Sequence, residues 1–257
     1  MREAFYFVVC VNDESHYSRC LKHLQALEIP NGYEIEIKKI VGATSIAAAY
    51  DDAMRASDAR YKIYLHQDTF VLDPHFLHHL LDIFKSHPKV GMIGAMGGTH
   101  LPRSGIWFED GVHSYGQIMR HGHREGILNR WLPRRLNPDH VRVFRYRPVQ
   151  KEFLPVVCID GLIMATQYDI PWRKDLFRGF IYYEGPHCLE FIKRGYEVVV
   201  PHQEKPWCLH WGANRAPEED QKYHAQFRQL MEIFRREYAQ FLGKNIDEIR
   251  RFVKKEG

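Results

Sequence analysis

The sequence lacks any apolar run long enough to cross a membrane, because a spanning helix needs roughly 20 apolar residues. The run from Phe5 to Val9 near the N-terminus is also too short for the apolar region of a signal peptide. No small-residue cleavage site follows it. We therefore expect a cytoplasmic protein and leave open a peripheral contact with the inner face of the membrane.

Cysteine is scarce, and the five residues are scattered without a Cys-x-x-Cys pair. An odd number at such spacing does not suit a disulfide framework or a zinc site. Cys10 and Cys158 lie inside apolar runs, which is typical of buried free thiols. This cysteine usage indicates a reducing compartment.

The chain has no large excess of charge of one sign, because it contains 36 Lys and Arg and 32 Asp and Glu, which gives a formal net charge of +4. A nucleic-acid-binding domain usually carries a clustered basic stripe, so we expect no nucleic-acid partner. Basic residues do crowd two segments, 130–147 and 250–255. These are either solvated surface or contacts with phosphate groups or an anionic membrane face.

Strands and helices alternate in the first part of the chain. Strands are predicted at 4–11, 33–41, 61–65 and 90–93, with helices between them that begin near Ser15, at Thr44 or Ser45, and at Asp73-Pro74. Such alternation favours an α/β fold with a parallel sheet between helical layers. Segment 104–131 is predicted as loops with short hairpin strands and segment 142–157 as extended chain, and the sequence is helical again from Pro217.

Polar residues follow three of the predicted strands, as Asn12-Asp13, Gly42-Ala43-Thr44 and His66-Gln67-Asp68. Ligands of open parallel sheets bind beyond the carboxyl ends of the strands. The alternative is that these residues only form turns and helix caps. A carboxylate after a buried strand suits Mg²⁺ or Mn²⁺ on phosphate oxygens, and a histidine in the set favours Mn²⁺.

A family resemblance follows from longer segments. Residues 45–54 and 61–70 resemble family 2 glycosyltransferases of GT-A fold, in particular a bacterial branch with His-Gln-Asp where most relatives have Asp-x-Asp. Residues 160–165, 180–184 and 188–198 are similar to the acceptor-side half of that family, and 208–212 resembles its late His-x-Gly element. The resemblance implies a Rossmann-like three-layer sandwich with a mostly parallel central sheet. It covers residues 1–212 and leaves 213–257 as a helical extension, which we expect to pack on the same domain.

The resemblance also implies roles for the strand-end residues. Asn12 and Asp13 are expected to contact the nucleotide base or ribose, and Thr44, Asp51 and Gln67 belong to the expected nucleotide-binding set. Asp51 stands where relatives often have Asn, and Gln67 also serves the turn.

The metal and catalytic residues are implied in the same way. Asp68 is the expected metal ligand; His66 ligates the metal, contacts ribose or shapes the turn; His210 is a third ligand or a histidine packed between tryptophans. Glu184 is the expected catalytic carboxylate. Asp160 is its rival for that role or a contact of the donor sugar.

These residues suit an inverting glycosyltransferase. The expected donor is a nucleoside-diphosphate sugar, most favourably a UDP-sugar, and the acceptor is a hydroxyl of a glycan, a lipid-linked glycan or a protein. Mn²⁺ or Mg²⁺ would assist departure of the phosphate, and Glu184, desolvated among aromatic residues, would take the acceptor's proton. Two alternatives remain: a metal-dependent phosphate-ester hydrolase or nucleotidyltransferase, and a non-catalytic module that binds nucleotide sugar or glycan. The oligomeric state stays open.

Overall fold

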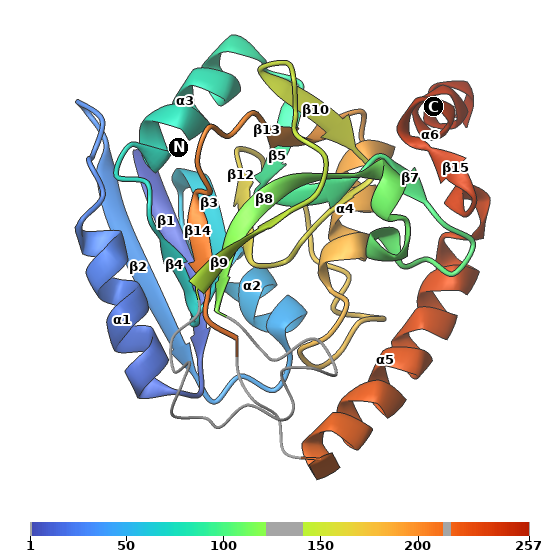
Figure 1. The fold of residues 1–257 in the computed structure, drawn as a ribbon, viewed down its shortest axis with the longest axis horizontal. Coiled ribbons are helices and arrows are strands. Elements are labelled where there is room, and N and C mark those ends of the chain that lie inside the picture. The colour runs from blue at the N-terminus through green and yellow to red at the C-terminus, as the bar shows by residue number, and fades with distance from the viewer. Residues whose placement is uncertain (1, 122–140, 213–216, 257) are drawn as a thin grey trace.

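The computed structural model describes residues 2–121, 141–212 and 217–256. Its centre is a seven-stranded sheet of order β10-β13-β5-β12-β3-β1-β2 (Figure 1). The strands are β1 (Arg2–Val11), β2 (Glu34–Val41), β3 (Ala59–His66), β5 (Val90–Gly94), β10 (Phe153–Val156), β12 (Ile163–Thr166) and β13 (Glu197–Pro201). Strand β12 runs antiparallel to both neighbours and β10 runs antiparallel to β13, whereas β1, β2, β3, β5 and β13 share one direction. The predicted mostly parallel α/β sheet is therefore confirmed.

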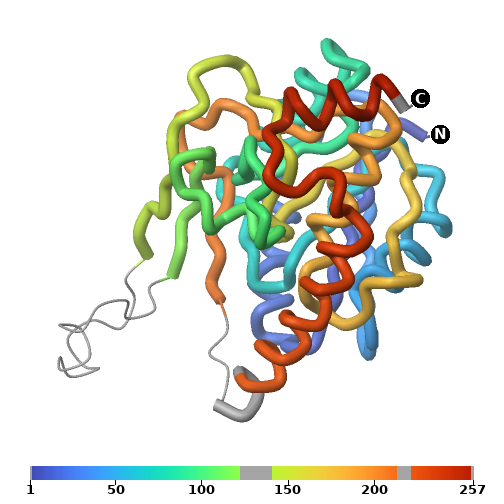
Figure 2. The backbone as a smooth tube through the Cα atoms, turned by 90° about the vertical axis from the view of Figure 1, so that its right-hand side faces the viewer, coloured from blue at the N-terminus to red at the C-terminus, as the bar shows by residue number. Residues whose placement is uncertain are grey.

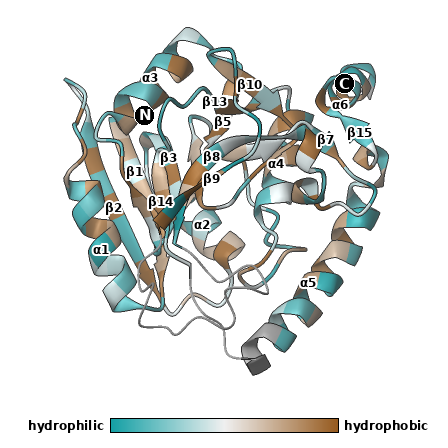
Figure 3. Ribbon diagram, in the orientation of Figure 1, coloured by the Kyte–Doolittle hydropathy of each residue, from teal (hydrophilic) through white to brown (hydrophobic). Residues whose placement is uncertain are grey.

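Strand β1 lies between β2 and β3 and runs parallel to both. Its apolar run is buried from Ala4 to Val9, as expected for a parallel strand covered on both faces. Figure 3 shows the same pattern across the molecule, with apolar strands inside and polar outer helix faces. The covering helices are α1 (Glu14–Gln25), α2 (Ile46–Arg55), α3 (Phe76–Ser86) and α4 (Glu184–Lys193).

A second sheet has the order β11-β6-β8-β14-β4, with β9 paired to β8. Its strands are short: β4 (Thr69–Val71), β6 (Met96–Gly98), β8 (Ser114–His121), β9 (Val141–Arg145), β11 (Cys158–Ile159) and β14 (Cys208–His210). The pair of β14 with β4 sets His210 opposite Thr69. This pairing brings a residue from late in the chain beside the turn that follows β3.

The C-terminal part runs along one side of the molecule (Figure 2). Helix α5 (Pro217–Glu237) buries Leu230 and Phe234 and is followed by α6 (Ile246–Glu256). Strand β15 (Lys244–Asn245) pairs with β7 (His100–Leu101). None of the helices in the described ranges is both long and apolar enough to cross a membrane.

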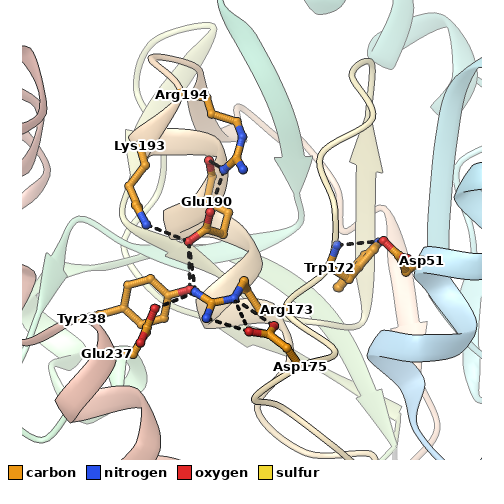
Figure 4. Close-up of polar contacts among 9 residues, drawn as sticks. All are labelled: Asp51, Trp172, Arg173, Asp175, Glu190, Lys193, Arg194, Glu237 and Tyr238. Carbon is orange, nitrogen blue, oxygen red and sulfur yellow. Dashed lines mark hydrogen bonds and ion pairs between the residues drawn. The ribbon is translucent and has the colours of Figure 1, made fainter. Parts of the chain in front are cut away.

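A buried ionic network holds the end of α5 to α4 (Figure 4). Arg173 lies 2.7 Å from Glu237 and 3.7 Å from Glu190, and the Tyr238 hydroxyl donates to Glu190 at 3.1 Å. Glu190 is 4% exposed. Because a buried carboxylate needs partners, this network anchors the C-terminal end of α5.

Several predicted boundaries and caps are wrong. Helix α1 is capped by Asp13, whose carboxylate accepts the N–H groups of Ser15 and His16, and not by Ser15 or Ser18. Helix α3 begins at Phe76 rather than at Asp73-Pro74, since the Asp73 carboxylate accepts the N–H of His75 and holds a turn there. Of the two predicted caps of α2, Thr44 and Ser45, the structure confirms Ser45. Three members of the basic segment, at positions 130, 134 and 135, lie outside the described residues.

Candidate functional site

The ends of β1 and β3 meet at one edge of the central sheet. The parallel pairing sets Cys10 beside His66, so the turns that follow the two strands are neighbours. The Gln67 carbonyl accepts the backbone N–H groups of Asn12 and Asp13, both at 2.9 Å, and its amide donates to the Asn12 side chain. Gln67 therefore ties the two strand ends together, which agrees with its expected service to the turn.

His66, Asp68 and His210 converge at this edge, and we name them the edge cluster. His210 Nε2 lies 3.5 Å from Asp68 Oδ2, and His66 Nδ1 lies 4.0 Å from Asp68 Oδ1. One ligand atom from each residue lies within 4.8 Å of the other two. The backbone N–H of Trp211 donates to the carbonyl of Asp68 and holds β14 against the turn. Two imidazole nitrogens and a carboxylate form a donor set that fits Mn²⁺.

Tyr183 orients the His66 ring. Its hydroxyl lies 2.5 Å from His66 Nε2 and 3.0 Å from the carbonyl oxygen of Gly161. The carbonyl can only accept, so the hydroxyl proton points to Gly161 and the hydroxyl accepts a proton from Nε2. His66 Nδ1 then carries a lone pair on the side of Asp68. Outer hydrogen bonds of this kind fix the tautomer of metal-binding histidines.

Burial and charge set the protonation of the edge cluster. Burial lowers the pKa of His66, and this effect exceeds the opposing influence of the Asp68 carboxylate. Burial would raise the pKa of Asp68, but the hydrogen bond from His210 and the charges of both histidines lower it to about 2. The cluster therefore offers a carboxylate and an uncharged His66 imidazole at neutral pH, as a divalent cation requires.

A pocket of about 590 Å³ opens beside the edge cluster. Its walls come from the three strand ends, from α2, from the segment before α4 and from α5. The lining residues are Cys10, Val11, Asn12, Gly42, Ala43, Ile46, Tyr50, Leu65, His66, Gln67, Asp68, Phe180, Ile181, Lys222, Tyr223 and Gln226. Among these described residues, Lys222 is the only lysine or arginine. A larger cavity of about 1000 Å³ holds none of the predicted site residues, so we assign no donor site there.

Three residues expected to contact the nucleotide do not line the pocket. The Asp51 side chain is fully buried and accepts from the backbone N–H of Trp172 at 3.1 Å (Figure 4). It also binds Arg55 at 2.9 Å and Lys174 at 2.8 Å. This arrangement indicates a structural role in place of the expected nucleotide contact. Thr44 is exposed in the loop before α2 and does not line the pocket. Asp13, the cap of α1, is also absent from the lining.

Glu184 and Asp160 lie outside the pocket lining but near the edge cluster. The charge of Asp160 acts on His66, and its carboxylate accepts the N–H of Leu162 at 2.9 Å. Glu184 is the first residue of α4. Burial raises the pKa of Glu184 to about 7, and the neighbouring carboxylate of Asp160 adds to the rise. Glu184 is therefore poised to exchange a proton near neutral pH.

Sequence reasoning missed several residues of the site. The contact of Tyr183 with His66 has no sequence signal other than the place of Tyr183 before Glu184. Tyr182 and Tyr183 are buried, whereas Phe180 is 49% exposed and lines the pocket. Lys222 belongs to the extension that the resemblance did not cover, so only the folded chain shows it at the pocket.

Comparisons with known proteins address the fold and the family. The sequence profile of the family described as "Glycosyltransferase like family" matches residues 6–231. No curated protein sequence matches the chain. Among solved structures, a mannosyltransferase of Pyrobaculum calidifontis, PcManGT, in complex with GDP-Man and Mn²⁺ is similar at a TM-score of 0.57 and 10% identity, over 100% of this chain and 69% of that one. Residues 1–349 of S. aureus TarS, in complex with UDP-GlcNAc, are similar at a TM-score of 0.51 and 8% identity, over 91% and 67% of the two chains.

Proposed function

Because the chain belongs to the glycosyltransferase-like family, we propose that it is an inverting glycosyltransferase using a nucleoside-diphosphate sugar. The observation that carries the proposal is the pocket at the carboxyl ends of β1, β2 and β3, with His66 and Asp68 of the edge cluster in its wall. The favoured donor is a UDP-sugar. The acceptor is a hydroxyl of a glycan, a lipid-linked glycan or a protein, as in the assembly of bacterial surface polysaccharides.

Asp68, His66 and His210 are the proposed ligands of Mn²⁺ or Mg²⁺. When bound, the ion supplies Lewis-acid stabilisation for the departing diphosphate. The lone pair of His66 Nδ1 and the ionised Asp68 support this role. The complexes of PcManGT with GDP-Man and Mn²⁺ and of TarS with UDP-GlcNAc agree with a donor of this class.

The nucleotide would lie between the strand ends and α5. Asn12, held by Gln67, is the proposed contact of the base or ribose. Lys222 is the proposed contact of the diphosphate, since it is the one cation among the described lining residues and faces a dianionic ligand. The extension at 213–257 would therefore complete the donor site of the domain formed by 1–212.

Glu184 is the proposed base that takes the proton of the acceptor hydroxyl. Its pKa of about 7 matches proton transfer near neutral pH. Asp160 is the second candidate for this role. Tyr182 and Tyr183, which precede Glu184 in the chain, are buried, in keeping with the burial that raises the pKa of Glu184.

We also propose a cytoplasmic location with peripheral contact at the inner face of the membrane. Helix α6 carries three exposed basic residues on its polar face, Arg251, Lys254 and Lys255. A basic amphipathic helix binds anionic lipid surfaces, and such contact would suit a lipid-linked acceptor.

Calorimetric titration with UDP and GDP, with and without Mn²⁺, tests the donor site. We expect binding that depends on Mn²⁺ in the native protein and is lost in Asp68→Asn. Donor consumption is then followed with and without candidate acceptors. Consumption only with an acceptor supports a transferase; equal consumption without one would indicate a hydrolase; metal-linked binding with no consumption would indicate a non-catalytic module.

A further inference from the structure

A second cluster with the same residue types lies in the segment between β6 and β8. His100, Asp110 and His113, here named the loop cluster, bring one ligand atom each to within 4.8 Å of one another. None of the three lines the pocket of the proposed donor site. The role of this cluster therefore needs a separate explanation.

The contacts of the loop cluster converge on one oxygen atom. His100 Nδ1 lies 2.6 Å and His113 Nδ1 lies 2.8 Å from Asp110 Oδ2, and the two rings are 5.4 Å apart. The side chains of His100 and Asp110 are 26% and 19% exposed, and that of His113 is 50% exposed. The cluster is thus partly shielded on one side and open to an ion on the other.

The backbone that carries the loop cluster is held by hydrogen bonds within its own turns. The carbonyl of His113 accepts from both the N–H and the hydroxyl of Thr99, and the carbonyl of Asp110 accepts from the N–H of His113 and the hydroxyl of Ser114. His100 lies on β7, which pairs with β15. The backbone that carries all three side chains is therefore fixed without a ligand. The entropic cost of ordering the site when an ion binds would be small.

We propose that the loop cluster is a structural binding site for a late transition-metal dication such as Zn²⁺. Two imidazole nitrogens with one carboxylate oxygen bind Zn²⁺ in preference to Mg²⁺ or Ca²⁺. At the edge cluster the phosphate oxygens of the proposed donor would add the oxygen ligands that suit Mn²⁺ or Mg²⁺, whereas the loop cluster does not line that pocket.

In the present hydrogen bonds each Nδ1 carries a proton, because the Asp110 oxygen can only accept. On binding, each Nδ1 gives up this proton to water and the neutral imidazole carries its single proton on Nε2, so that the two Nδ1 lone pairs and the Asp110 carboxylate supply three ligands. Water completes the tetrahedron.

The geometry requires only a small adjustment. Ligand atoms of a tetrahedral zinc site, with bonds of about 2.0–2.1 Å, lie about 3.3 Å apart. The present separations of 2.6 and 2.8 Å are those of hydrogen bonds, so each side chain must withdraw by roughly half an ångström. The bound ion would join β7 to the turn at 110–113. Through β7 it would also strengthen the attachment of the C-terminal segment.

The test uses Zn²⁺ alone, titrated calorimetrically into chelator-treated full chain without nucleotide. The background is Asp68→Asn, which weakens the edge cluster as a competing site. In this background we expect one Zn²⁺ per chain and a rise in Tm with the metal. His113→Ala added to it should weaken Zn²⁺ at least tenfold.

The matched control is His87→Ala in the same background, because His87 is a half-exposed histidine with one carboxylate partner, Glu152, at 3.0 Å. It should leave Zn²⁺ binding unchanged. If His113→Ala does not fold by circular dichroism, His100→Gln takes its place with the same expectation. Absence of Zn²⁺ binding in the background variant, or equal binding in His113→Ala, would overturn the proposal. Because the test contains no nucleotide, a lack of Zn²⁺ binding at the loop cluster would not count against the proposed transferase function. A lack of transferase activity would likewise not count against the Zn²⁺ site.

Discussion

The edge cluster and the loop cluster contain the same three residue types and differ in how they are arranged. In the edge cluster the two histidines approach different oxygens of Asp68, at 3.5 and 4.0 Å, beside a pocket of about 590 Å³. In the loop cluster both histidines contact one oxygen of Asp110, at 2.6 and 2.8 Å, and none of the three lines that pocket. Two histidines and an aspartate therefore do not define an active site. An open cleft and an oriented ring distinguish one cluster from the other.

Removing the central carboxylate of each cluster should give the largest difference in turnover between the two clusters. Asp68→Asn removes the anionic ligand of the proposed metal, and we expect transferase turnover to fall about 10³-fold or more, since the metal supplies several kcal/mol. Asp110→Asn should leave turnover unchanged. Steady-state rates at saturating Mn²⁺ measure both. A comparable loss in Asp110→Asn would contradict the functional division between the clusters.

Glu184→Gln tests the proton acceptor beside the edge cluster. General-base assistance contributes about 10²–10⁴-fold, so turnover should fall by about that factor while UDP affinity stays within about twofold. Rapid-quench assays give the rate and calorimetry gives the affinity. Unchanged turnover would remove Glu184 from the base role and shift the test to Asp160→Asn.

The pKa of Glu184 predicts the pH dependence. Only the ionised carboxylate accepts a proton, so the rate should rise with pH and level off above about pH 7. The raised pKa also means that the protonated group favours the folded state. Its contribution to stability is fully present below the ordinary pKa of 4.5 and is lost as pH rises through about 7. A rate profile of the native protein that is flat between pH 5 and 8 would contradict this assignment.

Tyr183→Phe tests whether the hydrogen bond from the His66 ring to Tyr183 is needed for metal binding at the edge cluster. The variant removes the hydroxyl that accepts from His66 Nε2, and outer-shell losses of this kind cost about 10–100-fold in metal affinity. Binding of Mn²⁺, followed by electron paramagnetic resonance without donor, should weaken accordingly. Zn²⁺ at the loop cluster should be unaffected. Tight Mn²⁺ binding in Tyr183→Phe would show that the tautomer is set by other contacts.

Lys222→Ala should give the smallest effect. Lys222 is exposed, so its attraction to the diphosphate is screened by water and salt. We expect UDP affinity to fall about two- to fivefold, with a smaller difference at high salt. Lys254→Ala, an exposed lysine on α6, is the matched control and should leave the affinity unchanged. Equal affinities of the Lys222→Ala variant and the native protein at low salt would remove Lys222 from the donor site.

The fold was predictable where local patterns decide it. The apolar run of β1 and the polar residues after β1 and β3 predicted the sheet and its functional edge. The short strands β4 and β14 were missed because their pairing depends on residues far apart in the sequence. The burial of Asp51 was not predictable for the same reason, since its partners Lys174 and Trp172 come from more than 120 positions away. His210 was anticipated only through the family resemblance, and pairing of β14 with β4 explains its place.

The anchoring of α5 has a thermodynamic consequence for the donor site. One end of this helix is held by the network of Arg173, Glu190 and Glu237, and the other supplies Lys222 and Gln226 to the pocket wall. Apparent affinity equals the intrinsic affinity multiplied by the fraction of molecules in which the wall is in place. Donor binding and the seating of α5 are therefore linked equilibria. The ion-pair partners of Arg173 in the described chain, Asp175, Glu190 and Glu237, all lie outside the pocket lining. Arg173 therefore influences donor binding through that population.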